Sequence, residues 1–329
     1  MTAAEKRKLG ASGIAVAPLG LGCMSFSGTY GSGDDAAAAM LINDALDRGV
    51  TMLDTSDAYG NGHNEELVGR AIAKRRGSIV LATKFGNMRS GAPRPVDGRP
   101  EYVPVACEAS LKRLGVEVID LFYAHRIDPH VPIEETVGAM ARLVEQGKVR
   151  ALGLSEAKPE TIRRAHKTHP IAAVQSEYSL LYRVEAEETL KTTRELGIAF
   201  VAYAPLGRGL LTGKIEAAPS FEKGDTRGRH PRFLADNLAH NRTLVERIAA
   251  IAAEKGCTPA QLVLAWLLAQ GPDVIPIPGT KHRERLDENL GALELRLTAQ
   301  DVTRISAAIP PGAAAGTRYP EQQMTHVYV

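Results

Sequence analysis

The chain of 329 residues predicts an α/β fold, a (β/α)8 TIM barrel that occupies residues 1–329 as a single domain. One phrase recurs along the sequence: a helical pattern ends in a glycine, and a short apolar run rich in β-branched residues follows almost at once. Glycine suits the left-handed position that ends a helix, and such runs are typical of strands buried on both faces. Eight parallel strands that alternate with helices are the pattern of this barrel.

The eight predicted strands follow from these apolar runs. They lie in PLGLGCM (18–24), LDRGVTMLDT (46–55), KRRGSIVLATK (74–84), KRLGVEVIDLFYAH (112–125), VEQGKVRALGLSE (144–156), PIAAVQSEY (170–178), RELGIAFVAYAP (194–205) and LAQGPDVIPIPG (268–279). The helices between them are predicted to be amphipathic. In one of them a single helical face carries Ile133, Val137, Met140, Leu143 and Val144.

Two segments lie outside the repeated phrase. KRKLGASGIAVAP (6–18) alternates around a Ser12-Gly13 turn, which predicts a small hairpin that closes the bottom of the barrel. Residues 207–240 contain few periodic apolar residues, and loops of that length in a compact barrel are usually functional lids. We therefore expect this segment to cover a site.

A doubly wound fold would need a glycine-rich phosphate loop after a strand. Gly31, Gly33 and Ala36 fit the spacing GxGxxA, but no strand is predicted directly before them. Asp34 and Asp35 would also lie where a pyrophosphate should bind. The sequence therefore favours the barrel.

Composition restricts the partners. Lys plus Arg is 40 and Asp plus Glu is 38, and a formal charge of +2 gives no broad basic field for nucleic acid. The longest apolar run, at 262–269, is too short to cross a bilayer, and the N-terminus lacks the apolar core of a signal peptide. Three unpaired cysteines favour a reducing cytoplasm. Oligomeric state, including a homo-oligomer, stays open.

Barrels of this class carry their chemistry at the C-terminal ends of the strands, so the residues at those positions matter most. In chain order these positions are Gly22, Cys23 and Met24, then Asp54, Lys84, His125, Ser155, Gln175, Tyr203, and finally Pro278, Gly279 and Thr280. An acid, a lysine and a histidine follow successive strands, and Tyr59 comes five residues after the acid. We expect these four side chains to meet at one rim.

This combination suits proton donation to an oxygen. A free tyrosine has a pKa of about 10, and a nearby ammonium such as that of Lys84 is expected to lower it towards a useful general acid. Asp54 would keep the lysine charged, and His125 would bind a substrate oxygen or relay the proton. Carbonyl reduction is the natural reaction, with an electron source supplied by a cofactor.

Other chemistries fit the residues less well. GLSEA (153–157) nearly matches the GxSxG turn of serine hydrolases but has Ala157 where glycine is needed. A Schiff-base lysine must be neutral, whereas an acid beside Lys84 predicts the opposite. HRIDPH (125–130) lies in a predicted loop without a third placed ligand, so no metal site is predicted.

With these residues the chain resembles the aldo-keto reductase superfamily over nearly its whole length. The motifs are DTSDAYG, LATK and LFYAH, together with YAPLGRGLLTGK and IPIPGTKHRERLDENL. The last two resemble a bacterial branch near the potassium-channel beta subunits and pyridoxal reductases. The resemblance implies a catalytic tetrad of Asp54, Tyr59, Lys84 and His125, and extra helices near the C-terminus. It also implies a non-enzymatic NADPH-binding regulatory subunit as the alternative, although such relatives tend to lack the histidine.

The resemblance also implies the cofactor site. Ser155 and Gln175 would hold the nicotinamide carboxamide, and Tyr203 would stack on the ring. The other strand-end positions expected to bind the cofactor are Gly22, Cys23, Met24, Asp54 and Pro278. The pyrophosphate would follow residues 205–214, which include Pro205, Leu206, Arg208, Gly209 and Lys214, under a lid that carries Arg232. Ala204, directly before this segment, is also expected at the cofactor. The 2′-phosphate and adenine would lie at Gly279, Thr280, Lys281, Arg285, Glu288 and Asn289. Family members often have asparagine at position 156 and serine at position 204, so Glu156 and Ala204 put those two contacts in doubt.

Cofactor choice also has a physical basis. Lys281 and Arg285 are predicted one turn apart on the same side of a helix start. A 2′-phosphate is a dianion that suits two such cations and the free amides of a helix N-terminus. The sequence therefore predicts NADPH/NADP+ and a small-molecule carbonyl substrate. Substrate specificity is expected in loops 25–33, 86–100 and 127–132 and in the tail after Pro311.

Overall fold

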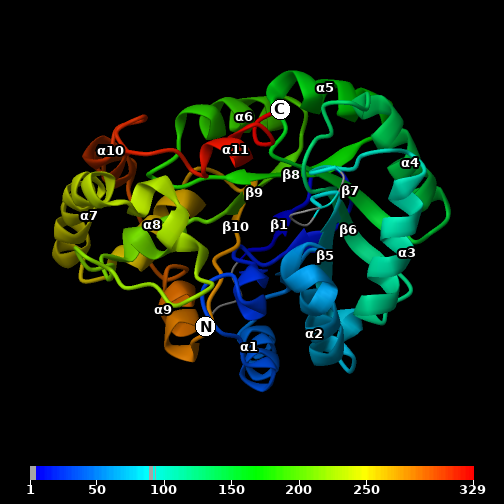
Figure 1. Ribbon diagram of the computed structural model, residues 1–329. Coiled ribbons are helices and arrows are strands. Elements are labelled where there is room, and N and C mark those ends of the chain that lie inside the picture. The colour runs from blue at the N-terminus through cyan, green and yellow to red at the C-terminus, as the bar shows by residue number, and fades with distance from the viewer. Residues whose placement is uncertain (1–4, 89–91, 93) are drawn as a thin grey trace.

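Eight parallel strands form one sheet in the computed structural model, which describes residues 5–88, 92 and 94–329 (Figure 1). They are β3 (Leu21–Gly22), β4 (Met52–Asp54), β5 (Val80–Phe85), β6 (Ile119–Ala124), β7 (Val149–Ser155), β8 (Ile171–Glu177), β9 (Ala199–Tyr203) and β10 (Val274–Pro276). Neighbours in sequence are neighbours in the sheet, and each predicted segment contains one strand. The sheet closes because the Gly20 amide donates to the Pro276 carbonyl at 3.0 Å and Gly22 donates to Pro278 at 3.3 Å. The predicted barrel is confirmed.

Helices surround the strands (Figure 1). Those that follow the strands are α1 (Asp35–Asp47), α2 (His63–Ile72), α3 (Tyr102–Leu114), α4 (Ile133–Glu145), α5 (Pro159–Thr168), α6 (Val184–Glu195), α7 (Ala235–Glu254), α8 (Pro259–Leu268) and α9 (Arg283–Gly291). Two more, α10 (Ala299–Ala308) and α11 (Glu321–Met324), come near the C-terminus as expected. Within the described ranges, no helix combines the length and apolar character needed to cross a membrane.

The predicted N-terminal hairpin is confirmed. β1 (Arg7–Lys8) pairs antiparallel with β2 (Ala15–Val16). Leu9 and Ile14 from its turn are buried and pack with Met52 and Val80, which begin β4 and β5, so the hairpin fills the end of the barrel opposite the strand C-termini. Gly10 has φ +52° there, and a Cβ on it would lie 2.8 Å from the Ala172 carbonyl oxygen. Glycine is needed for that close approach.

The long segment after β9 is only partly a loop. It contains the 3-10 helices η4 (Gly207–Thr212), η5 (Thr226–Arg229) and η6 (Pro231–Phe233). Because α7 already begins at Ala235, the predicted loop boundary at residue 240 is wrong. The Thr226 amide donates to the Thr29 carbonyl at 3.0 Å, which joins this segment to the loop after β3. Three further 3-10 helices lie elsewhere: η1 (Met24–Ser27), η2 (Tyr59–Gly62) and η3 (Arg76–Ser78).

Two helical glycines allow a matched test of packing. A Cβ on Gly69 in α2 would lie 2.4 Å from the Leu114 carbonyl oxygen at the end of α3. Gly69→Ala should therefore lower the free energy of unfolding by about 1–3 kcal/mol through overpacking. Gly138 in α4 has nothing within 4 Å of such a Cβ, so Gly138→Ala should raise it by about 0.5–1 kcal/mol. Denaturant unfolding of both variants measures the difference, and equal effects would contradict this account of the α2–α3 contact.

Candidate active site

The four predicted catalytic side chains lie together at the C-terminal ends of the strands. Asp54 ends β4, Lys84 lies near the end of β5, and His125 directly follows β6. Tyr59 begins η2, in the connection from β4 to α2. Parallel register between neighbouring strands brings these positions to the same rim.

The Lys84 ammonium is fully buried and is bonded on three sides. Its Nζ lies 2.5 Å from Asp54 Oδ1, 2.8 Å from the Thr55 carbonyl oxygen and 3.4 Å from the Tyr59 hydroxyl. An ammonium has three N–H donors, so each finds an acceptor. The second Asp54 oxygen accepts a hydrogen bond from Gln175 Nε2 at 2.8 Å. Lysine, carboxylate and phenol are thus held as one unit.

The pKa of the Tyr59 phenol differs from the sequence expectation. Burial raises that pKa above its ordinary value, and the charge of Lys84 offsets this effect only in part. The expected net lowering is therefore wrong, because removal from water disfavours the phenolate more than the lysine favours it. Burial also opposes the charge of Lys84, but Asp54 outweighs it and raises the pKa of the ammonium. At neutral pH the phenol is protonated and the lysine is charged.

His125 faces Tyr59 and is neutral. The two rings meet edge to face with centroids 5.8 Å apart. Burial, followed by the charges of Arg126 and Lys84, lowers the pKa of His125 well below its ordinary value. Its Nδ1 lies 2.9 Å from Ser56 Oγ; when that hydroxyl donates, Nε2 carries the proton of the ring. His125 can then donate a hydrogen bond to a substrate oxygen.

The predicted cofactor residues occupy the same rim and the segments beside it. The strand ends carry Gly22 in β3, Ser155 in β7, Gln175 in β8 and Tyr203 in β9, and Cys23 and Met24 directly follow β3. The segment after β9 carries Ala204, Pro205, Leu206, Arg208, Gly209 and Lys214, and η6 carries Arg232. The segment after β10 carries Pro278, Gly279, Thr280 and Lys281, and α9 carries Arg285, Glu288 and Asn289. Lys214 contacts Glu288 at 3.1 Å, which brings the turn after β9 to α9. Since α9 begins at Arg283, Lys281 precedes the helix rather than lying on it.

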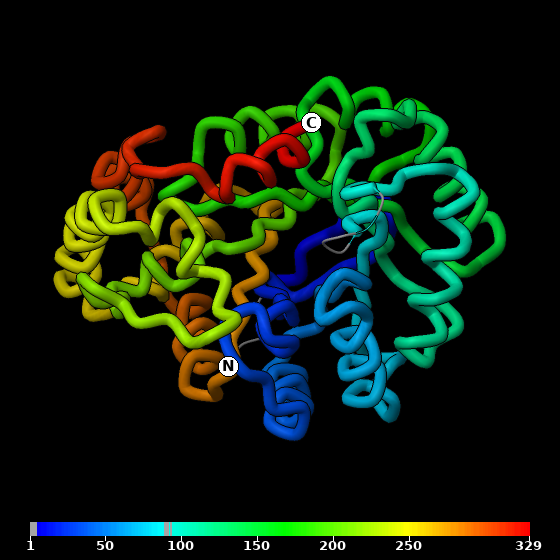
Figure 2. Tube along the Cα trace, viewed as in Figure 1, coloured from blue at the N-terminus to red at the C-terminus, as the bar shows by residue number. Residues whose placement is uncertain are grey.

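Glu156 has a partner that the sequence analysis did not identify. Its buried carboxylate receives two hydrogen bonds of 2.8 Å from Arg318, and the Tyr203 hydroxyl donates to it at 2.8 Å. Burial opposes ionisation, but Arg318 lowers the pKa of Glu156 to about 2. The backbone amide of Val329 also donates to the Glu156 carbonyl oxygen at 3.1 Å, and the backbone amide of Lys158 donates to the Val329 carbonyl oxygen. Glu156 thereby attaches the C-terminal segment, red in Figure 2, to the β7–α5 connection.

A second buried carboxylate binds the segment after β9. Glu177, which ends β8, lies 2.8 Å from Arg232 Nη1 and 3.0 Å from Arg208 Nη1. Arg232 also donates to the Leu181 carbonyl at 2.9 Å. Arg232, which the sequence predicted on a lid, lies in η6 and is only 6% exposed. It belongs to a buried ion-pair cluster with Glu177 and Arg208.

Sequence reasoning missed Glu177, Arg318 and Tyr319 at this site. The Tyr319 hydroxyl lies 2.9 Å from that of Tyr203, and the Arg208 guanidinium lies 4.8 Å from the Tyr319 ring centroid. The only available signals were that Arg318 and Tyr319 lie in the tail expected to carry specificity and that Glu177 lies near the end of a predicted strand. Of the predicted substrate loop 86–100, residues 89–91 and 93 lie outside the described residues.

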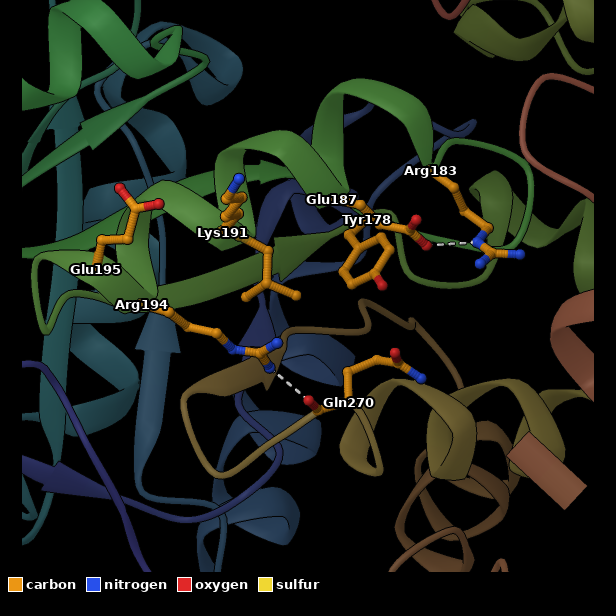
Figure 3. A pocket seen from close by; sticks show the side chains of 8 residues that line it. Tyr178, Arg183, Glu187, Lys191, Arg194, Glu195 and Gln270 are labelled. Atoms are coloured by element: carbon orange, nitrogen blue, oxygen red, sulfur yellow. Dashed lines mark hydrogen bonds and ion pairs between the residues drawn. The ribbon is translucent and has the colours of Figure 1, made fainter. Parts of the chain in front are cut away.

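A cavity of about 580 Å³ lies away from this rim, against α6 and the end of α8 (Figure 3). Both arginines that line it form ion pairs: Arg183 with Glu187 at 2.6 Å, and Arg194 with Asp273 at 2.8 Å. None of the predicted site residues lines it. This cavity is therefore separate from the candidate site at the strand ends.

Known proteins share this architecture. Residues 18–310 match the Aldo/keto reductase family. The chain is 49% identical to "Probable aldo-keto reductase 1" of Glycine max, over 95% of this chain and 91% of that protein. Among solved structures it is similar to the glycerol dehydrogenase AKR11B4 from Gluconobacter oxydans (TM-score 0.83, 30% identity, 95% of this chain and 98% of that one). It is also similar to the holo form of the aldo-keto reductase AKR11C1 from Bacillus halodurans (TM-score 0.79, 29% identity, 97% and 99%). The chain therefore belongs to the aldo/keto reductase family, whose members are oxidoreductases that use nicotinamide cofactors.

Proposed function

We propose that this protein reduces an aldehyde or ketone to the alcohol with NADPH, and that residues 1–329 act as one domain in the cytoplasm. The observation that carries the proposal is the contact of the buried Lys84 ammonium with both Asp54 and the Tyr59 hydroxyl. Reduction of a carbonyl needs a proton for the oxygen as negative charge builds there. A protonated phenol beside a fixed cation supplies it.

In this mechanism Tyr59 donates its proton to the carbonyl oxygen. Lys84 stabilises the phenolate that is left, and Asp54 keeps the lysine charged and oriented. His125 donates a hydrogen bond to the same oxygen and orients the carbonyl. When bound, a reduced nicotinamide would supply the hydride that the carbonyl carbon needs.

The residues after β10 fit the phosphate end of such a cofactor. The Ser25 hydroxyl is buried without a hydrogen-bond partner among the described residues, and it lies 3.7 Å from the Cβ position of Gly279. No side chain caps the N-terminus of α9, so its first amides are available to an anion. At α1, in contrast, Asp34 accepts from the Ala36 and Ala37 amides and occupies the equivalent place. Lys281 would add a cation beside the α9 amides.

The nicotinamide end requires one revision of the proposed contacts. Gln175 is already bonded to Asp54, and Glu156 to Arg318 and Tyr203. We therefore propose that Ser155, which is buried at the end of β7, is the main contact of the nicotinamide carboxamide. Gln175 would contact both the carboxamide and Asp54. Glu156 instead holds the C-terminal segment, and Tyr203 presents its ring while its hydroxyl stays bonded to Glu156.

Replacement of Tyr59 tests the proton donor. Tyr59→Phe should lower kcat by roughly 10² to 10⁴ because the variant lacks the acidic hydroxyl, while NADPH binding stays nearly unchanged. The measurement is NADPH consumption with an aldehyde panel, beside fluorescence titration of the cofactor. Tyr102→Phe removes a hydroxyl at the start of α3 and is the matched control, expected to keep wild-type turnover. Wild-type turnover in Tyr59→Phe would exclude this donor.

Replacement of Lys281 tests cofactor choice. Lys281→Met should weaken NADPH binding by about 1.5–3 kcal/mol, the contribution of one hydrogen bond to a charged group. NADH lacks the 2′-phosphate, so its affinity should change little and serves as the control. Lys281 also donates to the Tyr30 and Ser32 carbonyls at 2.7 and 3.1 Å, and loss of these loop contacts would affect both cofactors alike. Equal weakening of NADPH and NADH would refute the phosphate assignment.

Replacement of Glu156 tests the attachment of the C-terminal segment. Glu156→Gln leaves the buried Arg318 charge unpaired and should lower the free energy of unfolding at pH 7 by about 3–5 kcal/mol. The pKa of Glu156 is about 2 in the folded protein against an ordinary 4.5. The stability that the ionised Glu156 contributes is therefore fully present above pH 4.5 and decreases as pH falls towards 2. Urea unfolding from pH 7 to pH 3 should show the two proteins converge. The control Glu134→Gln breaks an exposed ion pair with Arg164 and should lower the free energy of unfolding by at most about 1 kcal/mol. Equal losses in the two variants would contradict the role of Glu156 in holding the C-terminal segment.

A further inference from the structure

Arg126 is a cation at the rim with unused hydrogen-bonding capacity. It directly follows His125 in the sequence, and its side chain is half-buried. Its Nη1 donates to the His125 carbonyl at 2.8 Å, and its guanidinium lies 6.0 Å from the Tyr319 ring centroid. In the part of the chain that the structure describes, no carboxylate pairs with it. A guanidinium has five N–H donors, and removal of such a charge from water is costly without an anion.

Each of the other arginines of this rim has a carboxylate partner. Arg208 and Arg232 share the Glu177 carboxylate, and Arg318 forms a two-bond pair with Glu156. Glu156 accepts from Arg318 and Tyr203, and among the described residues it forms no ion pair with Arg126. Arg126 is thus the arginine of the cluster that remains open to a ligand.

The charge of Arg126 also acts on the reacting groups. It contributes to the lowered pKa of His125, where burial is the larger cause. Burial raises the pKa of Tyr59, and the charge of Arg126 opposes this rise, although less than the charge of Lys84 does. Since these two side chains flank the carbonyl in the proposed mechanism, a substrate bound there has the guanidinium as a near neighbour.

We propose that Arg126 binds a carboxylate carried by the substrate, so that the preferred substrates are aldehydes or ketones that also bear an acid group. This inference rests on the proposed carbonyl reduction and adds a substrate class to it. The planar fork of an arginine matches the two oxygens of a carboxylate.

Matched acids and esters test this inference. The substrates are 4-oxobutanoate with its methyl ester, and 4-carboxybenzaldehyde with methyl 4-formylbenzoate, each measured with saturating NADPH at pH 7. For at least one pair the wild-type enzyme should show a kcat/KM for the acid at least about tenfold above that for the ester. Arg126→Gln should reduce this acid-to-ester ratio by about 10- to 100-fold, mainly through KM, as expected for loss of a charged hydrogen bond.

Two further variants complete the design. Arg126→Lys keeps the charge but not the fork and should give an intermediate ratio. Arg164→Gln removes an arginine that pairs with Glu134 on the outer surface and should leave the ratio unchanged. The inference would be overturned by an acid-to-ester ratio that is unchanged in Arg126→Gln, or by a wild-type ratio near one for both pairs. In either case, reduction of the esters would still support the proposed function. Failure of the wild-type enzyme to reduce any of the four compounds would count against both.

Discussion

The buried ion pair between Lys84 and Asp54 is the contact on which the candidate site depends. A lysine without solvent exposure keeps its charge only when a carboxylate and further acceptors surround it. Asp54 provides the charge, Thr55 provides a carbonyl, and Gln175 holds the second carboxylate oxygen. These groups come from β4, the residue after it, β5 and β8, so the closed barrel is a precondition of the pair. Tyr59 then lies against the one remaining N–H of the ammonium.

A second set of buried charges holds the segments that cover the rim. Glu156 and Glu177 belong to adjacent strand ends, and their arginine partners come from η4, η6 and the C-terminal segment. Buried ion pairs contribute little net stability when complete, but loss of one partner is costly. Incorrect placement of any of these segments would leave a charge unpaired. The cluster therefore specifies where the covering segments lie more than it stabilises the fold as a whole.

Local pattern explains which features were predictable. The eight strands, and the meeting of Asp54, Lys84 and His125 at one rim, followed from apolar runs and from the residues at their ends, because parallel strands end at a common rim. The contact of Glu156 with Arg318 spans 162 residues and has no local signature, so only the folded chain reveals it. The start of α7 was misplaced because its first turns carry few apolar residues. The direction of the Tyr59 pKa was wrong because burial depends on packing that a sequence does not state. The bacterial sub-branch stays a prediction.

That corrected pKa changes the role of the lysine. A phenol already ionised at neutral pH would have no proton to donate, so a raised pKa in the resting site preserves the acid. The Lys84 ammonium interacts weakly with the neutral phenol, at 3.4 Å, and in the proposed mechanism it would interact strongly with the phenolate that proton transfer leaves. An interaction that strengthens as charge develops lowers the barrier without stabilising the starting state. Burial, which opposes ionisation at rest, also keeps water from weakening that interaction when the charge appears.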